Sequence, residues 1–150
     1  MYLAALEKAI TLAVDGASVS TICGTVDDFV EEELKKTFSN KKSKNLERGI
    51  AFPCCLSINE IAGHYSPCAD DSVNLKNGDV VKIELGAHID GFAAGVAHTI
   101  VVGGKAEGKA AEVILAAHNA FLAAQRSIRV GGLNQEVTAK IQAVCDEFGV

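Results

Sequence analysis

The sequence predicts an α+β fold in which helices pack on a curved antiparallel sheet. Two segments with the apolar spacing of amphipathic helices open the chain, short β runs fill its middle, and two more helical segments follow. The expected order is therefore ααβββαα. Because the strands lie together between pairs of helices instead of alternating with them, an antiparallel sheet is favoured over a parallel one.

The helical segments are defined by apolar residues that recur every three or four positions. A glycine follows the first segment, a lysine-rich stretch follows the second, and Asn134 is expected to cap the last. The four helices are expected at about residues 2–15, 20–38, 110–128 and 135–148.

The strongest β signal is "VVKIELGAHIDGFAAGVAHTIVV" (80–102), which we interpret as a hairpin with Asp90-Gly91 as a two-residue turn. Facing residues then have numbers that sum to 181, so Glu84 faces Ala97. One face is apolar and expected in the core, with His98 as a core histidine. The other face carries one carboxylate over small residues: Lys82, Glu84, Gly86 and His88 beside Ala93, Gly95, Ala97 and Thr99.

Two shorter β runs, "GIAFP" and "CLSIN", precede the hairpin. Pro53 ends the first of them, and a proline cannot donate to the hydrogen-bond ladder of a central strand. We therefore expect that a central strand cannot continue through Pro53.

Composition favours a soluble intracellular protein. The chain has 150 residues, 49% of them hydrophobic and 22% charged, and no apolar run approaches the ~20 residues of a membrane span. The number of cysteines is odd, which suits reduced thiols. Cys54, Cys55, His64 and Cys68 invite a zinc interpretation, but no Cys-x2-Cys pair is present, so buried thiols are favoured.

The net charge of −5 argues against a nucleic-acid surface over the whole domain. One stretch differs, because six basic residues fall within positions 35–48 and are interrupted by a single acid. It is either a solvated loop after a helix or a phosphate-contacting patch. The six residues are Lys35, Lys36, Lys41, Lys42, Lys44 and Arg48.

Several blocks in order resemble the pita-bread fold of the methionine aminopeptidases. They are Gly49 to Pro53, Ser57 to Asn59, His64 to Pro67 and Gly78 to Val102. The resemblance is strongest to the non-peptidase, proliferation-associated (ErbB-receptor-binding) branch of the type 2 enzymes, and it covers nearly the whole chain. It implies that residues 1–150 form a single partial domain, the N-terminal half of this fold, with the remainder beyond residue 150.

In the type 2 peptidases two aspartates of this hairpin hold two divalent metals, and a histidine of the preceding loop contacts substrate. The resemblance places Glu84 and Gly95 at the aspartates and His64 at the histidine. Glycine offers no ligand, and glutamate displaces its oxygens by ~1.5 Å in a site that clamps two ions ~3.5–4 Å apart. We therefore expect a vestigial pocket with no metal, no cofactor and no catalytic residue.

Simpler interpretations of the same residues remain. Glu84 could pair with Lys82 or His88 on a solvated strand face, and His64 could be an ordinary loop histidine. Neither alternative needs a pocket.

The resemblance implies a non-catalytic protein of cell growth that binds structured RNA, ribosomes and protein partners in the cytoplasm and nucleus, including the nucleolus. The alternative is a methionine aminopeptidase that removes initiator methionine, as a full-length protein with an altered metal site. Since the family fold is built from two related halves, half of it leaves a sheet edge uncovered. We therefore expect the isolated chain to self-associate, as a twofold-symmetric homodimer.

Overall fold

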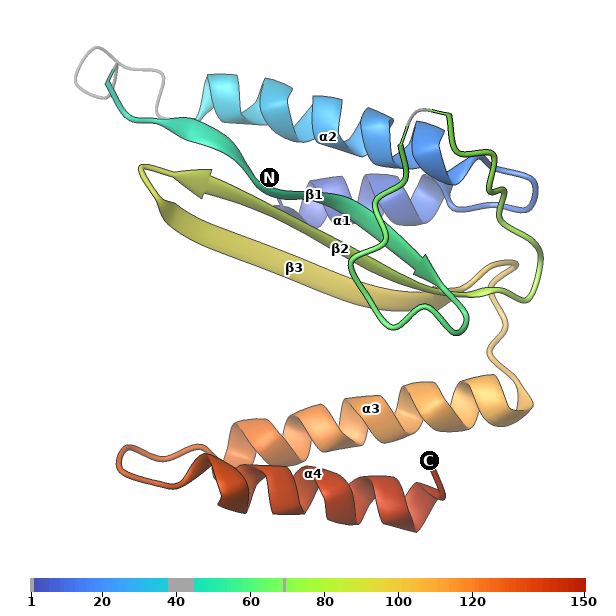
Figure 1. Cartoon of the computed structure of the whole chain (residues 1–150), viewed down its shortest axis with the longest axis vertical. Coiled ribbons are helices and arrows are strands. Elements are labelled where there is room, and N and C mark those ends of the chain that lie inside the picture. Colours follow the sequence, from blue (N-terminus) through green and yellow to red (C-terminus); the bar gives the residue numbers. More distant parts are fainter. Residues whose placement is uncertain (1, 38–44, 69) are drawn as a thin grey trace. The chain divides into compact units, whose positions relative to one another are not determined.

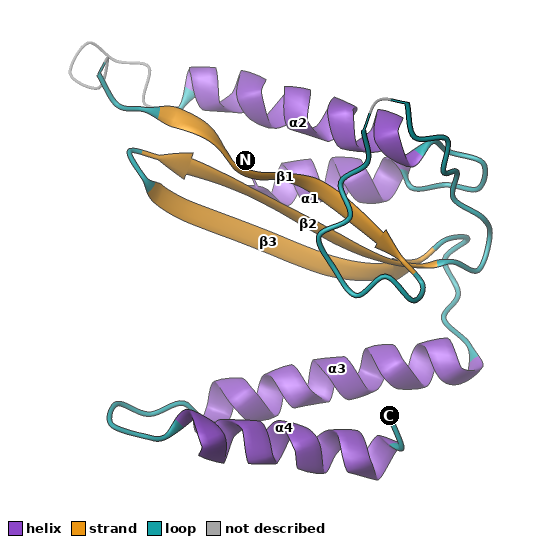
Figure 2. Cartoon of the chain, viewed as in Figure 1, coloured by secondary structure: helices purple, strands orange, loops and turns teal. Residues whose placement is uncertain are grey.

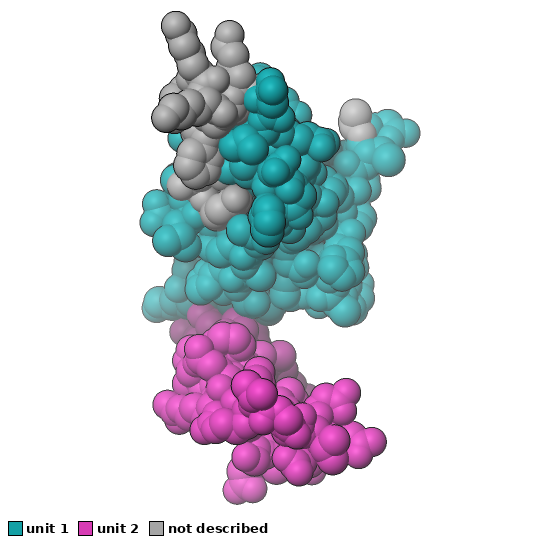
Figure 3. Space-filling view, turned by 90° about the vertical axis from the view of Figure 1, so that its left-hand side faces the viewer, with its two compact units in different colours: residues 1–105 teal, residues 106–150 magenta. Residues whose placement is uncertain are grey.

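The computed structural model describes residues 2–37, 45–68 and 70–150, and it contains two compact units, residues 1–105 and 106–150 (Figure 3). The predicted α+β class and the order ααβββαα are confirmed (Figures 1 and 2). The first unit comprises α1 (Tyr2–Leu12), α2 (Val19–Lys36), β1 (Arg48–Ile58), β2 (Val80–Ile89) and β3 (Phe92–Val101). The second unit comprises α3 (Gly108–Ser127) and α4 (Asn134–Phe148).

The three strands form an antiparallel sheet in the order β1-β2-β3, and α1 and α2 pack on one of its faces (Figure 1). The core lies between these helices and the sheet. From α2 it takes Val19, Val26 and Val30, and from β2 it takes alternate residues, as expected for a strand with one buried face. These β2 residues are Val81, Ile83, Leu85 and Ala87.

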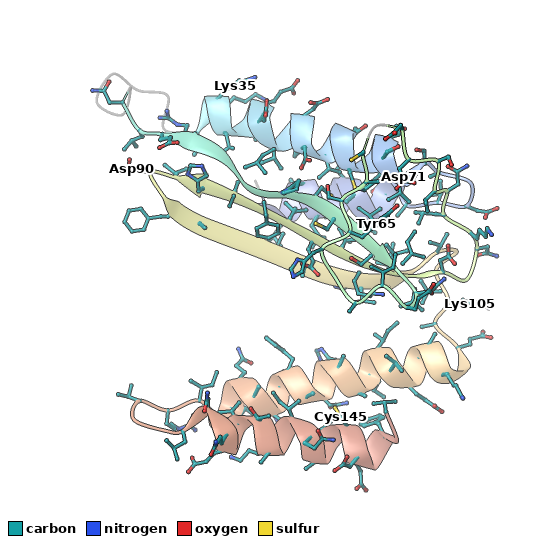
Figure 4. All side chains as sticks on the ribbon, in the orientation of Figure 1. Lys35, Tyr65, Asp71, Asp90, Lys105 and Cys145 are labelled. Atoms are coloured by element: carbon teal, nitrogen blue, oxygen red, sulfur yellow. The ribbon has the colours of Figure 1, made fainter. Side chains whose placement is uncertain are left out.

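The turn and the register of the predicted hairpin are confirmed. Asp90 and Gly91 have φ of 53° and 80°, the left-handed pair that a type I′ turn requires. Asp90 is labelled at the tip of the hairpin in Figure 4. The strands pair without a register shift from Val80 opposite Val101 to Ile89 opposite Phe92, so Glu84 faces Ala97. The turn therefore fixes which residues share each face.

Two expectations about the sheet are wrong. The runs before the hairpin form one strand, β1, which continues through Pro53 because β1 is an edge strand and its register shifts between Phe52 and Cys55. His98 is exposed and not a core residue, although the predicted register is correct. The helices bury the central strand more completely than β3, whose Phe92 is 81% exposed.

The second unit is a helical hairpin with little buried surface. Of its residues only Ala116 and Ala120 are buried, and both belong to α3. α4 begins at Asn134 itself, with Leu133 at the capping position, and ends at Gly149, whose φ of 67° is the left-handed conformation that closes many helices. Within the described residues, no helix has both the length and the apolarity that crossing a membrane requires.

Candidate functional site

The structure brings together His64 and Glu84, two of the three residues that the family resemblance places at the former metal site. Glu84 lies on β2, on the face away from α1 and α2, and its carboxylate Oε2 is 3.3 Å from His64 Nδ1. The His64 side chain is 87% exposed and that of Glu84 is 24% exposed. The partner of Glu84 therefore comes from the loop that precedes the hairpin.

His64 is held at this place by a loop with its own hydrogen bonds. The backbone N–H of Tyr65 donates to Ser57 Oγ (3.1 Å), and Tyr65 O accepts from the N–H of Leu56 (2.9 Å). Tyr65 also donates its hydroxyl to the Asp71 carboxylate, which raises the pKa of Tyr65 (Figure 4). His64 itself has a left-handed φ of 62°, so the backbone turns sharply where the imidazole meets Glu84.

The alternative partners of Glu84 are occupied elsewhere. Lys82 donates from Nζ to the carbonyl of Asn59 (2.6 Å), and burial lowers the pKa of this lysine. His88 accepts a hydrogen bond at Nδ1 from the N–H of Gly91 (3.4 Å). An ion pair of Glu84 with either residue is therefore not the arrangement in this structure.

Phe52 fills the space above the glycines, a feature that the sequence interpretation missed. Gly86 and Gly95 face each other across β2 and β3. A Cβ atom on Gly86 would overlap the Phe52 ring, whereas a Cβ on Gly95 would lie 3.4 Å from Phe52 Cζ, at ordinary contact distance. The signal was available, since 86 and 95 also sum to 181, and two facing glycines leave room for a large side chain.

Like Phe52, Cys55 lies near the site although the sequence interpretation did not place it there. It pairs with Glu84 across β1 and β2 and is buried. Burial, and after it the negative charge of Glu84, raise the pKa of the Cys55 thiol. The thiol is therefore kept in its neutral, weakly reactive form.

The other thiols do not form a zinc site with Cys55. Cys54 lies in the core with Cys23, and a hydrogen bond between the two thiols, together with burial, raises the pKa of Cys54 far above its ordinary range. Cys68 is exposed. Across residues 2–37, 45–68 and 70–150, no cluster of three or more His, Cys, Asp or Glu side chains could hold a metal ion.

The residues that the resemblance places at the metal site, His64, Glu84 and Gly95, do not fit a two-metal centre. Where the peptidases supply two carboxylates from the hairpin, this chain supplies one, at Glu84, and that carboxylate contacts His64. Gly95 has no side chain, and the aromatic ring of Phe52 lies beside it. A phenyl ring offers no ligand to divalent cations, which bind oxygen and nitrogen atoms.

The predicted basic patch is described only in part. Lys35 and Lys36 are the last two residues of α2 (Lys35 in Figure 4). Lys36 forms an ion pair with Glu33 (2.6 Å), and this contact raises the pKa of Lys36. Arg48 donates to the carbonyls of Thr37 (3.0 Å) and Leu46 (2.8 Å). Lys41, Lys42 and Lys44 lie outside the described residues.

A hollow of about 540 Å³ lies beside these basic residues. Lys35 and Arg48 line it together with the acid Glu31. Its other described lining residues are Leu34, Leu46 and Gly49. The structure thus places two of the six predicted basic residues around one concave surface.

Comparison with known proteins assigns the chain to a family. Metallopeptidase family M24 matches residues 4–150, and the chain belongs to this family. Its fold is accordingly the N-terminal half of the pita-bread fold, as the sequence resemblance predicted.

Two curated relatives match almost the whole chain. Proliferation-associated protein A of Dictyostelium discoideum is 49% identical over 97% of this chain and 38% of its own length. ERBB-3 binding protein 1 of Arabidopsis thaliana is 43% identical over 96% of this chain and 37% of its own length. The chain thus spans less than two fifths of the length of these relatives.

A solved structure of a thermophilic Arx1 has the same fold. It superposes with a TM-score of 0.71 and 26% sequence identity, over 93% of this chain and 40% of that one. The curated relatives confirm the predicted resemblance to the proliferation-associated branch, and the solved structure supports the fold.

Proposed function

We propose that this protein is a non-catalytic M24 family member that acts by binding structured RNA or ribosomes together with protein partners. The observation that carries the proposal is the arrangement of residues on the open face of the hairpin. The carboxylate of Glu84 is paired with His64, and Phe52 lies against the glycine pair at the position where the resemblance expects the second ligand. This arrangement supports a binding role, because metal activation of water in the peptidases needs both ligands of the hairpin.

The relatives support a binding role by their names. One relative is named as a proliferation-associated protein and another as an ERBB-3 binding protein. We extend this role to the present chain and expect the protein in the cytoplasm and the nucleus, including the nucleolus. For RNA, the support within the chain is the concave surface with Lys35 and Arg48.

Peptidase assays test the non-catalytic part of the proposal. Hydrolysis of a short methionyl peptide is measured with added Co²⁺ or Mn²⁺, for the full-length protein and for its Glu84→Asp, Gly95→Asp variant. No turnover by the native full-length protein is expected. Metal-dependent turnover by the native full-length protein would overturn the proposal and favour the alternative, a methionine aminopeptidase with an altered site.

Salt dependence tests the RNA-binding part. Affinity for a structured RNA hairpin should fall with salt, with a slope of about −0.7 to −0.9 per neutralised phosphate. Lys35→Ala should weaken binding and reduce that slope by roughly one contact. Lys140→Ala, on α4, removes the same charge from the second unit and is the matched control. A slope that does not respond to Lys35→Ala would exclude this surface.

A further inference from the structure

Two cysteines of the core lie against each other between α2 and β1. Cys23 belongs to α2 and is 3% exposed, and Cys54 belongs to β1 and is fully buried. Both belong to the continuous hydrophobic cluster of the first unit, and their thiols are joined by a hydrogen bond. This contact lies inside the core and does not depend on any exposed surface.

A second contact places the same two residues together independently. Asp27 Oδ1 accepts a hydrogen bond from the backbone N–H of Cys54 (2.8 Å). Cys23 precedes Asp27 by about one turn of α2, so both side chains lie on one side of the helix. The bond to Asp27 therefore holds Cys54 beside the turn of α2 that carries Cys23.

The other cysteines are separated from this pair by their positions in the fold. Cys55 pairs with Glu84, so it lies on the opposite face of the sheet, and its thiol donates to the carbonyl of Pro53 (3.3 Å). Cys68 is exposed in the loop before the hairpin, and Cys145 belongs to the second unit. The fold thus selects one pair of thiols from the five cysteines of the chain.

We propose that Cys23 and Cys54 are an oxidative modification site, at which hydrogen peroxide converts the two thiols to a disulfide between α2 and β1. In the first step one sulfur attacks the peroxide, an S–O bond forms as the O–O bond breaks, and one water leaves. The second sulfur then attacks the sulfenic acid, an S–S bond forms as the S–O bond breaks, and a second water leaves. The peroxide gains two electrons and both thiol protons.

The contact between the thiols favours the disulfide over other products of the sulfenic acid. Further oxidation to a sulfinic acid needs a second peroxide molecule, whereas the second thiol is already in place. The hydrogen bond with Cys23, together with burial, raises the pKa of Cys54 far above its ordinary range. The thiol therefore stays neutral and reacts slowly, so the site responds to sustained exposure and not to a brief pulse of peroxide.

The test maps cysteine pairs in the full-length protein after prolonged exposure to hydrogen peroxide. Remaining thiols are blocked with N-ethylmaleimide, and tryptic peptides are sequenced by mass spectrometry. The peptide that contains Cys23 should be linked to Cys54, and dithiothreitol should separate the two peptides. If Cys23 and Cys54 stay reduced under peroxide that oxidises Cys68, or if Cys23 is linked to Cys55 instead, the proposal is overturned.

Single substitutions make the assignment specific. Cys23→Ala and Cys54→Ala should each abolish the link, whereas Cys55→Ala, the matched control, should leave it in place. If circular dichroism shows that an alanine variant is unfolded, oxidation of the native protein in urea decides. Unfolded chains should join Cys23 to several cysteines, and folded chains should join it to Cys54 alone. The same mixture of pairs in both conditions would mean that the fold does not select this pair, and the proposal would be wrong.

Discussion

Phe52 and Gly86 show how one residue without a side chain makes room for another with a large one. The ring lies on the glycine pair formed by Gly86 and Gly95, and it remains 38% exposed. This close approach explains why position 86 is glycine, because any larger side chain there would overlap the ring.

The two glycines should respond differently to the same substitution. Gly86→Ala should lower the free energy of unfolding by roughly 1–3 kcal/mol, because the new Cβ overlaps the Phe52 ring and the ring must move. Gly95→Ala adds the same methyl group at ordinary contact distance and should change stability by less than about 0.5 kcal/mol. Urea denaturation measures both. If both variants lose the same free energy of unfolding, the backbone conformation, and not the contact with Phe52, would be the reason for glycine at these positions.

At the scale of elements, Asp27 ties α2 to β1. Its carboxylate Oδ1 accepts a hydrogen bond from the backbone N–H of Cys54 (2.8 Å), close to the register shift in β1. The bond satisfies a backbone donor that an irregular strand would otherwise leave without a partner. Burial raises the pKa of Asp27, and the bond from Cys54 offsets part of this effect.

This carboxyl should make stability depend on pH. Because the folded pKa of Asp27 is raised above its ordinary value of 3.8, the folded state binds more protons, and this contribution to stability falls as pH rises from 3.8 through the folded pKa. Asp27→Asn keeps an acceptor for Cys54 and should abolish that component in urea titrations. Asp28→Asn removes a charge from an exposed neighbour and should retain it. Identical pH profiles for the native chain and Asp27→Asn would contradict the prediction.

Local signals in the sequence determine some elements well and others poorly. The Asp90-Gly91 turn predicts the hairpin register residue by residue, since its left-handed conformation admits one pairing. The sequence predicted that a central strand would not continue through Pro53. β1 does continue, because it is an edge strand where the missing N–H is not needed, and edge position is a property of the assembled sheet.

The candidate site, too, was predictable only in part from the sequence. The family resemblance placed His64 and Glu84 at one site but did not predict the contact between them. The position of Phe52 over the glycines depends on a neighbouring strand's rotamer and register shift. The exposure of His98 was not predictable from alternation, because alternation identifies a face but not how far helices cover it.

At the scale of the whole molecule, the two units contain very different amounts of core. The continuous hydrophobic cluster lies entirely within residues 1–105, from Ala5 to Val102. Residues 106–150 bury two alanines and expose large apolar side chains such as Phe121, Ile128 and Leu133. The stability of the chain is therefore expected to reside in the first unit.

Amide exchange should separate the two units. Under native conditions the amides of α3 and α4 should exchange well before those of α2 and β2, because few buried apolar contacts oppose opening of the helical hairpin. Mass spectrometry of peptic fragments from the 150-residue chain resolves this order. Simultaneous exchange of all four elements would mean that the chain opens as one cooperative unit.

The continuous ladder between β2 and β3 also limits how the gene can change. Substitutions in residues 80–101 alter single side chains, but loss of one residue inside either strand moves every side chain beyond it to the opposite face. Glu84 and the buried row that begins at Val81 would then exchange places. Insertions and deletions among descendants of this sequence should therefore accumulate in loops, and the hairpin should keep its length while its residues diverge.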